Sequence, residues 1–201
     1  NGSNLLVGDK GYRGVVLKLD GPMEEIHTEG TLVRAGAGAL LSRVAAEARE
    51  RNLSGMEFAA GIPGSIGGAV VMNAGAYGGE MKQIVVSVRG MDKEGEILTL
   101  DNDTMEFGYR SSAIRNRPIV VLEVTLQLAE GHKEEIEAKM EELAGLRRSK
   151  QPLEFPSAGS TFKRPEGYFA GKLIMDAGMR GYRIGGAQVS EKHCGFIVNT
   201  G

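Results

Sequence analysis

Residues 60–68 read Ala-Gly-Ile-Pro-Gly-Ser-Ile-Gly-Gly, and residues 73–78 read Asn-Ala-Gly-Ala-Tyr-Gly. Many of these residues have little or no side chain, so their backbone can approach a ligand closely. Such a segment can offer several N–H groups to an anion, as a nest or at the start of a helix. The alternative is a tight turn packed against a sheet. A further glycine cluster, Asn1-Gly2-Ser3-Asn4, favours a ligand with a long polyphosphate spine.

The composition describes a folded protein with an excess of glycine. The chain has 201 residues, of which 41% are hydrophobic and 25% charged. Its length is sufficient for one large domain or two small ones. Its hydrophobic content is too high for a disordered chain. Glycine supplies 30 residues without a collagen-like period. The formal net charge of -2 gives no basic excess for binding a phosphate backbone, so no nucleic-acid partner is expected.

Cysteine content and hydropathy exclude further classes. The single Cys194 excludes a disulfide framework and a multi-cysteine metal site, and three scattered histidines predict no zinc site. No apolar run approaches the roughly 18 residues of a membrane helix, and no signal peptide is evident, so a cytoplasmic protein without membrane insertion is expected. The chain opens without Met and ends directly after a predicted strand, which we interpret as truncation at both ends.

The apolar pattern predicts strands and few helices without a regular βαβ alternation, and therefore an α+β fold. Helical spacing predicts one helix from near Gly38 to Arg51, a clearer one at 132–150 that Gln151-Pro152 ends, and a short one at about 170–177. A loop with a short helical turn is expected at 55–80. Strands are expected at residues 5–7, 15–17, 24–28, 31–35, 84–89, 96–100 and 119–128, with a hairpin turn at Glu29-Gly30.

Common nucleotide and catalytic motifs are incomplete. Gly61–Gly67 lacks the lysine of a P-loop, and Gly36-Ala37-Gly38 has Leu41 where a dinucleotide-binding fingerprint needs glycine. The segment Pro63–Gly67 resembles a nucleophile elbow whose first glycine is replaced by proline. Ser160–Lys163 matches the S-x-x-K pattern of acyl-transfer enzymes, but the motifs that accompany this pattern are missing.

Six segments together resemble the UDP-N-acetylenolpyruvoylglucosamine reductase (MurB) family of bacterial cell-wall synthesis, in the same order along the chain. Three of them resemble flavin-binding segments of the family: Asn1–Leu6, Gly61–Gly68 and Asn73–Gly78. Phe107–Ser112 resembles its Y-R-x-S catalytic segment, and Ala158–Lys163 resembles its A-G-S-x-F-K segment. Gly185–His193 resembles its substrate-domain segment. The short connection between Arg110 and the 132–150 helix resembles the type II branch.

The resemblance implies a fold of the MurB/vanillyl-alcohol-oxidase type. An FAD-binding domain would occupy residues 1–149, with residues 1–9 as the remnant of an N-terminal flavin subdomain. A small α+β substrate-binding domain would occupy residues 150–201 and be incomplete at its C-terminus. The family's catalytic glutamate would lie beyond Gly201, and most of its N-terminal domain would be missing. This chain by itself is therefore expected to bind FAD weakly and to turn over slowly or not at all.

The resemblance also implies the activity of a UDP-N-acetylmuramate dehydrogenase. NADPH would reduce FAD, which would then reduce the enolpyruvyl ether of UDP-N-acetylenolpyruvoylglucosamine to a lactyl ether. The product, UDP-N-acetylmuramate, is a peptidoglycan precursor, which links the activity to cell-wall biogenesis, cell shape and cell division. The expected partner is thus a UDP-sugar, and the expected cofactors are FAD and NADPH.

Two residues are expected to be catalytic. Arg110 carries a permanently charged fork suited to a carboxylate, and hydride addition beside a carboxylate needs such a cation. Ser160 would donate the proton to the other carbon. The alternatives are a surface ion pair for Arg110 and a turn residue for Ser160.

Other residues are assigned to binding by the same resemblance, and no metal ligand is expected. For Lys150, the alternative to substrate binding is a lysine at a helix C-terminus, which the helix dipole favours. For Tyr109, the alternative to flavin contact is an ordinary core tyrosine. The cofactor-binding candidates are Gly2, Ser3, Asn4, Leu5, Gly61, Ile62, Pro63, Gly64, Ser65, Gly67, Gly68, Asn73, Gly75, Ala76 and Tyr109. The substrate-binding candidates are Lys150, Lys163, Arg164, Gln188, Lys192 and His193.

Two other functions remain open from the sequence. Another flavoprotein of the same fold, such as an oxidase, would often link its flavin through His or Cys, and neither residue occurs at 55–80. A non-catalytic flavin or nucleotide-sugar binding module would keep the glycine loops but would not need Arg110 and Ser160 together.

Overall fold

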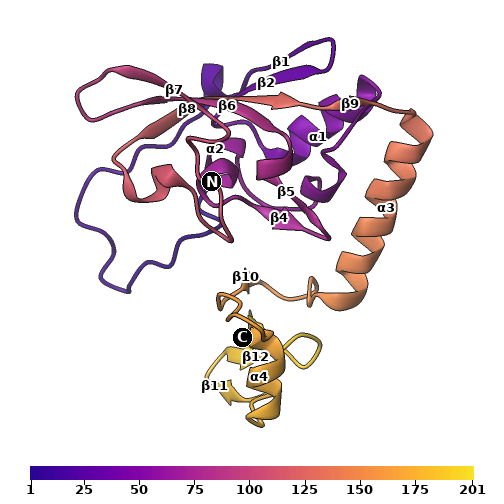
Figure 1. The fold of residues 1–201 in the computed structure, drawn as a ribbon. Coiled ribbons are helices and arrows are strands. Elements are labelled where there is room, and N and C mark those ends of the chain that lie inside the picture. Colours follow the sequence, from indigo (N-terminus) through magenta and orange to yellow (C-terminus); the bar gives the residue numbers. More distant parts are fainter. The chain divides into compact units, whose positions relative to one another are not determined.

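The predicted hairpin around Glu29-Gly30 forms one edge of the main sheet (Figure 1). In the computed structural model, which describes all of residues 1–201, β1 (Ile26–Glu29) pairs antiparallel with β2 (Leu32–Gly36). The sheet has the order β1-β2-β8-β6-β7 and is antiparallel throughout. Its other strands are β6 (Val85–Met91), β7 (Ile97–Asp101) and β8 (Val120–Gln127). The strands predicted at 84–89, 96–100 and 119–128 are therefore confirmed.

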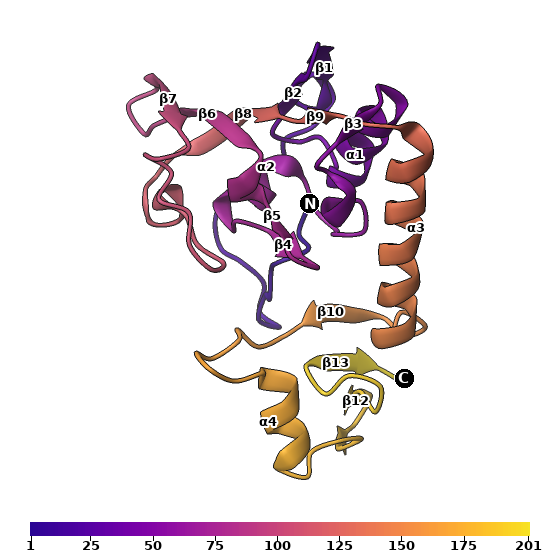
Figure 2. The same cartoon turned by 45° about the vertical axis from the view of Figure 1, so that its right-hand side comes forward.

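Two helices lie on one face of this sheet and complete its core (Figures 1 and 2). Helix α1 (Leu41–Glu50) buries Leu41, Val44, Ala45 and Ala48, the apolar stripe expected from its sequence. Helix α2 (Ile66–Val71) buries Ile66, Gly67, Ala69 and Val70, and the three apolar side chains belong to the same cluster. The predicted start of α1 near Gly38 is wrong by three residues, because Leu40 is extended and forms a β-bridge with Ser65 of the glycine-rich loop.

The segment 55–80 is a loop with a short helical turn, as predicted, but it also contains a small hairpin that was not predicted. A 3-10 turn, η2 (Glu57–Ala59), precedes α2, and the hairpin pairs β4 (Gly75–Ala76) with β5 (Gly79–Glu80). A second 3-10 turn, η3 (Met81–Gln83), leads into β6. The remaining short elements are η1 (Gly21–Glu24), β3 (Leu53–Ser54), η4 (Ala113–Asn116) and β9 (Ala129–Glu130).

Gly67 allows α2 to lie against the end of β2. A Cβ at this position would come within 2.7 Å of the Ala37 Cβ and 2.8 Å of the Ala37 carbonyl oxygen. We expect Gly67→Ala to lower the free energy of unfolding by about 1–3 kcal/mol. The adjacent Gly68→Ala is a matched control, since its Cβ would meet only Ser65 Oγ at 3.7 Å, and it should be neutral or stabilising by up to about 1 kcal/mol. Urea unfolding checks both values, and equal losses would contradict this account.

The first 20 residues contain no strand, so the strands predicted at 5–7 and 15–17 are wrong. The turn expected between them exists, because the Gly11 N–H donates to the Gly8 carbonyl at 2.8 Å. A strand is stable only when a neighbouring strand satisfies its backbone, and no strand pairs with this segment. The apolar side chains of residues 5–7 and 15–17 are exposed instead, from 56% for Val7 to 97% for Leu6.

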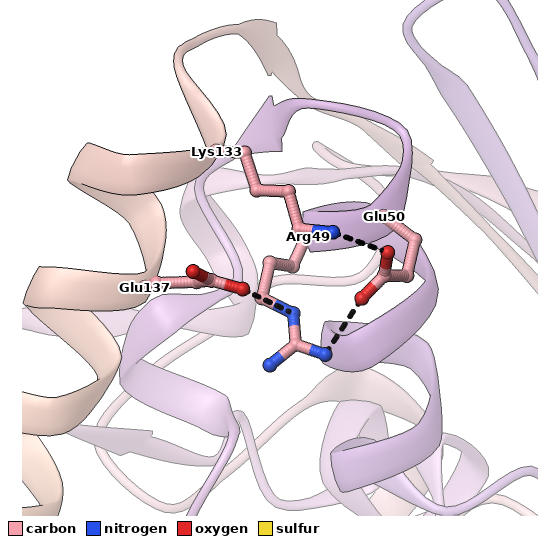
Figure 3. Close-up of polar contacts among 4 residues, drawn as sticks. All are labelled: Arg49, Glu50, Lys133 and Glu137. Atoms are coloured by element: carbon pink, nitrogen blue, oxygen red, sulfur yellow. Dashed lines mark hydrogen bonds and ion pairs between the residues drawn. The ribbon is translucent and has the colours of Figure 1, made fainter.

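Helix α3 (Lys133–Lys150) confirms the clearest helix predicted from the sequence. It buries Ile136 and Leu143, and Met140 packs against the main core. A charge cluster joins its first turns to the end of α1 (Figure 3). Lys133 Nζ lies 2.6 Å from Glu50 Oε2, and Arg49 contacts Glu50 at 2.7 Å and Glu137 at 3.6 Å.

The charge cluster predicts a stability difference that depends on pH. The hydrogen bond from Lys133, followed by that from Arg49, holds the pKa of Glu50 below its ordinary value of 4.5, and Glu50 raises the pKa of Lys133 above 10.5. A lowered carboxyl pKa stabilises the fold above pH 4.5 and loses this effect as the pH falls through the folded-state pKa. A raised lysine pKa stabilises it below pH 10.5 and loses this effect above the folded-state pKa.

Lys133→Met is therefore expected to lower Tm slightly between pH 4.5 and 10.5, by about 1–2 °C because the pair is exposed. The difference should shrink in acid and in high salt. Lys139→Met is the control, since Lys139 pairs only with Glu142 of the same helix. Thermal unfolding at several pH values measures both variants, and a deficit that persists unchanged in strong acid would argue against the assignment.

The C-terminal residues form a compact unit of their own. The chain divides into the compact units Asn1–Leu143 and Ala144–Gly201, so the second unit begins inside α3. The boundary at 149/150 between an FAD-binding and a substrate-binding domain stays a prediction. The sheet of the second unit has the antiparallel order β10-β13-β12-β11, and α4 (Ala170–Asp176) confirms the short helix predicted at 170–177. Cys194 is buried here. The strands are β10 (Ser157–Ser160), β11 (Arg183–Ile184), β12 (Ala187–Val189) and β13 (Phe196–Asn199).

Both units confirm the α+β class, because antiparallel sheets and separate helices replace any βαβ alternation. None of the helices combines the length and the apolar character needed to cross a membrane.

Candidate active site

The N-terminal segment and the glycine-rich loop meet at Pro63. Ser3 Oγ donates a hydrogen bond to the Pro63 carbonyl at 3.2 Å. A Cβ added to Gly64 would lie 3.1 Å from the same Ser3 oxygen, and Gly64 has a φ of +134°, which only glycine adopts readily. Two of the segments predicted to bind FAD are thus adjacent in space, although 60 residues separate them in the sequence.

The glycine-rich loop uses only part of its hydrogen-bonding capacity within the chain. The N–H groups of Ile66 and Gly67 donate to Ala39 and Ala37 at 2.8 and 3.0 Å. The N–H groups of Gly64, Ser65 and Gly68 donate to no acceptor of the chain, and Gly68 is exposed. Free N–H groups on a glycine-rich turn suit the diphosphate of a dinucleotide. The loop is therefore able to bind an anionic group such as a diphosphate.

Arg110 lies at the tip of a two-residue turn. Gly108 and Ser111 exchange backbone hydrogen bonds of 3.0 and 3.2 Å and close the turn. Arg110 has a φ of +53°, a left-handed conformation that costs a non-glycine residue energy and is typical of functional positions. Its Nη2 donates to the Gly75 carbonyl at 2.9 Å. The predicted catalytic arginine thereby contacts the predicted flavin segment 73–78.

The charge of Arg110 is not neutralised by a carboxylate of the chain, which contradicts a surface ion pair as its role. Its guanidinium carbon lies 5.2 Å from the centre of the Tyr109 ring. Tyr109 is 49% exposed, so the alternative of a core tyrosine is wrong. A half-buried cation beside an exposed aromatic ring can bind an anionic group while the ring lies against a flat ligand.

Ser160 lies at the end of β10, opposite Phe196 of β13. Its side chain is exposed, and its hydroxyl forms no hydrogen bond within the chain. Gly159 before it has a φ of +77°, and the β10–β13 register shifts between Ser157 and Ser160. Thr161 N–H donates to the Gly195 carbonyl at 2.9 Å and holds the strand end in place. The hydroxyl is therefore available to a ligand.

The segment 188–195 is organised around the buried side chain of Ser190. Ser190 Oγ accepts hydrogen bonds from the N–H groups of Lys192 and His193, both at 3.2 Å. His193 Nδ1 accepts the Gly195 N–H at 3.1 Å, so its neutral ring carries its proton on Nε2. The ring also packs edge-on against Phe196 at 4.9 Å. This arrangement presents the His193 ring in a fixed orientation.

Comparison with known proteins supplies the family. The profile of an FAD binding domain matches residues 1–101, and that of the C-terminal domain of UDP-N-acetylenolpyruvoylglucosamine reductase matches residues 151–201. The enzyme of that name from Lachnoclostridium phytofermentans is 59% identical over 204 residues, and that from Agathobacter rectalis is 55% identical; both alignments span the whole chain. The chain belongs to the MurB family.

A solved MurB structure agrees with this assignment. The crystal structure of UDP-N-acetylenolpyruvylglucosamine reductase (MurB) from Thermus caldophilus has a TM-score of 0.89 and 40% identity, and the match covers this whole chain and 73% of that one. The chain spans about two thirds of the curated relatives, 66% and 68% of their lengths. The expected FAD-binding domain and MurB fold are thus confirmed, and the relatives support neither the oxidase nor the non-catalytic module.

The structure arranges the predicted substrate residues of this MurB chain in two groups. Lys150 and Lys163 are exposed and form no ion pair. Three others donate to backbone carbonyls: Arg164 to Tyr168 at 3.2 Å, Gln188 to Gly181 at 3.2 Å and Lys192 to Arg148 at 2.8 Å. Lys192 also lies 3.6 Å from the Glu154 carboxylate, and His193 is held by the Gly195 N–H. Arg164 also stacks over the Phe169 ring at 4.0 Å.

Sequence reasoning missed the residues that support the site. Ser190 lies inside the segment 185–193, where its buried hydroxyl organises the turn. The signal in the sequence is its residue type, because serine hydroxyls often bind backbone N–H groups two residues on. Asn73 was expected to contact the cofactor, but its side chain is 1% exposed and its hydrogen bonds go to protein groups. Asn73 is thus buried among protein groups, and its contact with FAD stays a prediction.

Proposed function

We propose that the protein carrying this chain is an NADPH-dependent, FAD-containing UDP-N-acetylmuramate dehydrogenase. It would reduce UDP-N-acetylenolpyruvoylglucosamine to UDP-N-acetylmuramate in the cytoplasm during peptidoglycan precursor synthesis. The observation that supports this most is the hydrogen bond from Arg110 to the Gly75 carbonyl, because it ties a carboxylate-binding cation to a segment proposed to hold flavin. The names of the family relatives support the same activity.

The N-terminal segment, the glycine-rich loop and residues 75–76 would hold FAD. The free N–H groups of Gly64, Ser65 and Gly68 suit its diphosphate, and the exposed Tyr109 ring suits a flat ring system. Bound FAD would supply hydride transfer between NADPH and the substrate. The remaining chemistry falls to side chains of the chain.

Arg110 would bind the substrate carboxylate and stabilise the charge that develops beside it. Hydride addition to the methylene carbon leaves negative charge on the adjacent carbon, delocalised into the carboxylate. A guanidinium without a carboxylate partner in the chain has its charge free for this purpose. Because the left-handed backbone and the bond to Gly75 fix its position, little reorganisation is needed as the charge forms.

Ser160 would donate the proton that completes the reduction. A serine hydroxyl is a weak acid, so it can protonate only a strongly basic carbon within hydrogen-bond reach. Its hydroxyl is exposed and forms no hydrogen bond in the chain, so binding a substrate would break no existing hydrogen bond. Lys150, Lys163 and Arg164 would bind the carboxylate or diphosphate, and Gln188, Lys192 and His193 would line the substrate unit.

Product formation tests the proposed function. The full-length protein with FAD, NADPH and UDP-N-acetylenolpyruvoylglucosamine should yield UDP-N-acetylmuramate, which mass spectrometry identifies by the gain of two hydrogens. Oxidation of NADPH only in the presence of oxygen would indicate an oxidase, and stable flavin binding without any product would indicate a binding module.

A further inference from the structure

The buried side chain of Asn73 is used entirely by the protein. Its Nδ2 donates to the Gly108 carbonyl at 3.0 Å and to Glu80 Oε2 at 3.1 Å, and its Oδ1 accepts the Lys82 N–H at 2.9 Å. This network fixes the orientation of the amide, because only the NH₂ group can face two acceptors. A residue with a φ of +40° and a side chain 1% exposed is rigidly held. Asn73 therefore joins three segments: β5, η3 and the turn that carries Arg110.

The Gly108 carbonyl that Asn73 binds is one end of the Arg110 turn. The turn is held at further points: Arg110 Nη2 on Gly75, Ser112 Oγ on the Val71 carbonyl at 2.8 Å, and Arg115 on the Arg110 carbonyl at 3.1 Å. The segment 71–75 thus holds the turn at Gly108, at Ser112 and at the guanidinium. A left-handed arginine persists only where its surroundings impose that conformation.

We infer that Asn73 is a positioning residue for Arg110, and that the Glu80 carboxylate orients the Asn73 amide for this role. The inference rests on the proposed function, in which Arg110 stabilises charge on the substrate. Asn73 acts by holding the Gly108 carbonyl and with it the backbone from which the guanidinium extends. A displacement of about 1 Å at a catalytic group can lower the rate about 100-fold, so such a support affects the reaction without touching the substrate.

Asn73→Asp tests this with almost no change in volume. The aspartate keeps an oxygen for the Lys82 N–H but places its other oxygen against two acceptors, the Gly108 carbonyl and the Glu80 carboxylate. In the full-length protein we expect kcat to fall about 100-fold, with unchanged flavin content and a KM for NADPH within about threefold. Asn102→Asp is the matched control, since Asn102 Nδ2 also donates to two acceptors, the Lys82 and Val85 carbonyls, but does not contact residues 108–111. Its kcat should stay within about twofold of wild type.

A double-mutant cycle distinguishes positioning from general destabilisation. If Asn73 acts through Arg110, then Asn73→Asp should lower kcat no further in an Arg110→Met background. The same loss in both backgrounds would overturn the inference. If Arg110→Met has no effect on a flavin-loaded enzyme, the proposed function fails first, so the two failures are distinguishable.

Amide hydrogen exchange gives a readout that does not depend on activity. The Ser111 N–H donates to the Gly108 carbonyl and reports whether the turn is closed. Its exchange should accelerate at least tenfold in Asn73→Asp and remain unchanged in Asn102→Asp. Unchanged exchange in both variants would overturn the inference whatever the rate of the reaction.

If Asn73→Asp does not fold, Glu80→Ala tests whether Asn73 positions Arg110. It frees the Asn73 amide, so faster Ser111 exchange and a kcat about tenfold lower are expected. Glu80 also caps η3 together with Gln83, so Gln83→Ala is its control: it breaks the same capping box and leaves the Asn73–Glu80 contact. Equal effects of Glu80→Ala and Gln83→Ala would contradict the role of Glu80.

Discussion

Replacing Ser160 with alanine is expected to lower kcat about 10²- to 10⁴-fold while the protein keeps its flavin. The hydroxyl is exposed and forms no hydrogen bond within the chain, so its removal should leave the free energy of unfolding nearly unchanged. The reduction of bound flavin by NADPH should be unaffected, because the proton is needed only when the substrate is reduced. Rapid-mixing absorbance at the flavin band measures both half-reactions separately.

Ser157→Ala is the matched control for this experiment. Ser157 starts the strand that Ser160 ends, and its Oγ accepts only a long hydrogen bond of 3.4 Å from the Gly159 N–H. The kcat of Ser157→Ala should stay within about twofold of wild type. If Ser160→Ala also reduces the substrate at the wild-type rate, Ser160 is not the proton donor.

Replacing Arg110 with methionine is expected to lower kcat about 10²- to 10³-fold, because the developing charge loses its cation. Arg110→Lys should recover part of the rate, since it restores the charge without the two-pronged geometry. Steady-state kinetics with flavin-loaded protein checks both variants. Arg117→Met removes an exposed arginine from the following turn and serves as the control.

Arg110→Gly separates activity from stability at the same position. Glycine relieves the left-handed backbone conformation, worth about 1 kcal/mol, and this offsets the lost hydrogen bond to Gly75, also worth about 1 kcal/mol. We therefore expect stability near that of the wild type together with the full loss of rate. Wild-type kcat in Arg110→Gly or Arg110→Met would exclude Arg110 from the chemistry.

Elements with locally encoded boundaries were predictable from the sequence. Glu29-Gly30 between two β-rich runs determines a hairpin, and the apolar stripe of residues 132–150 followed by Pro152 determines α3. Elements that depend on a distant partner were not predictable. Residues 5–7 and 15–17 have strand-like composition but no neighbouring strand, and the start of α1 is set by the bridge from Leu40 to Ser65.

The candidate site shows the same limit. The motif around Arg110 could be recognised in the sequence, and so could the glycine-rich loop. The sequence could not show that Asn73, 35 residues before Gly108, uses its side chain to hold the turn of Arg110. The sequence assigned Asn73 to flavin binding only because Asn73 begins the segment 73–78. Long-range hydrogen bonds of this kind have no periodicity or spacing that a single sequence can display.

Flavin absorbance under anaerobic conditions tests the central claim most directly. The full-length protein, loaded with FAD, is first reduced with NADPH and then mixed with UDP-N-acetylenolpyruvoylglucosamine. The account predicts that the flavin band bleaches with NADPH and returns when this substrate is added. A band that stays bleached until oxygen enters, or a protein that binds no flavin, would contradict it.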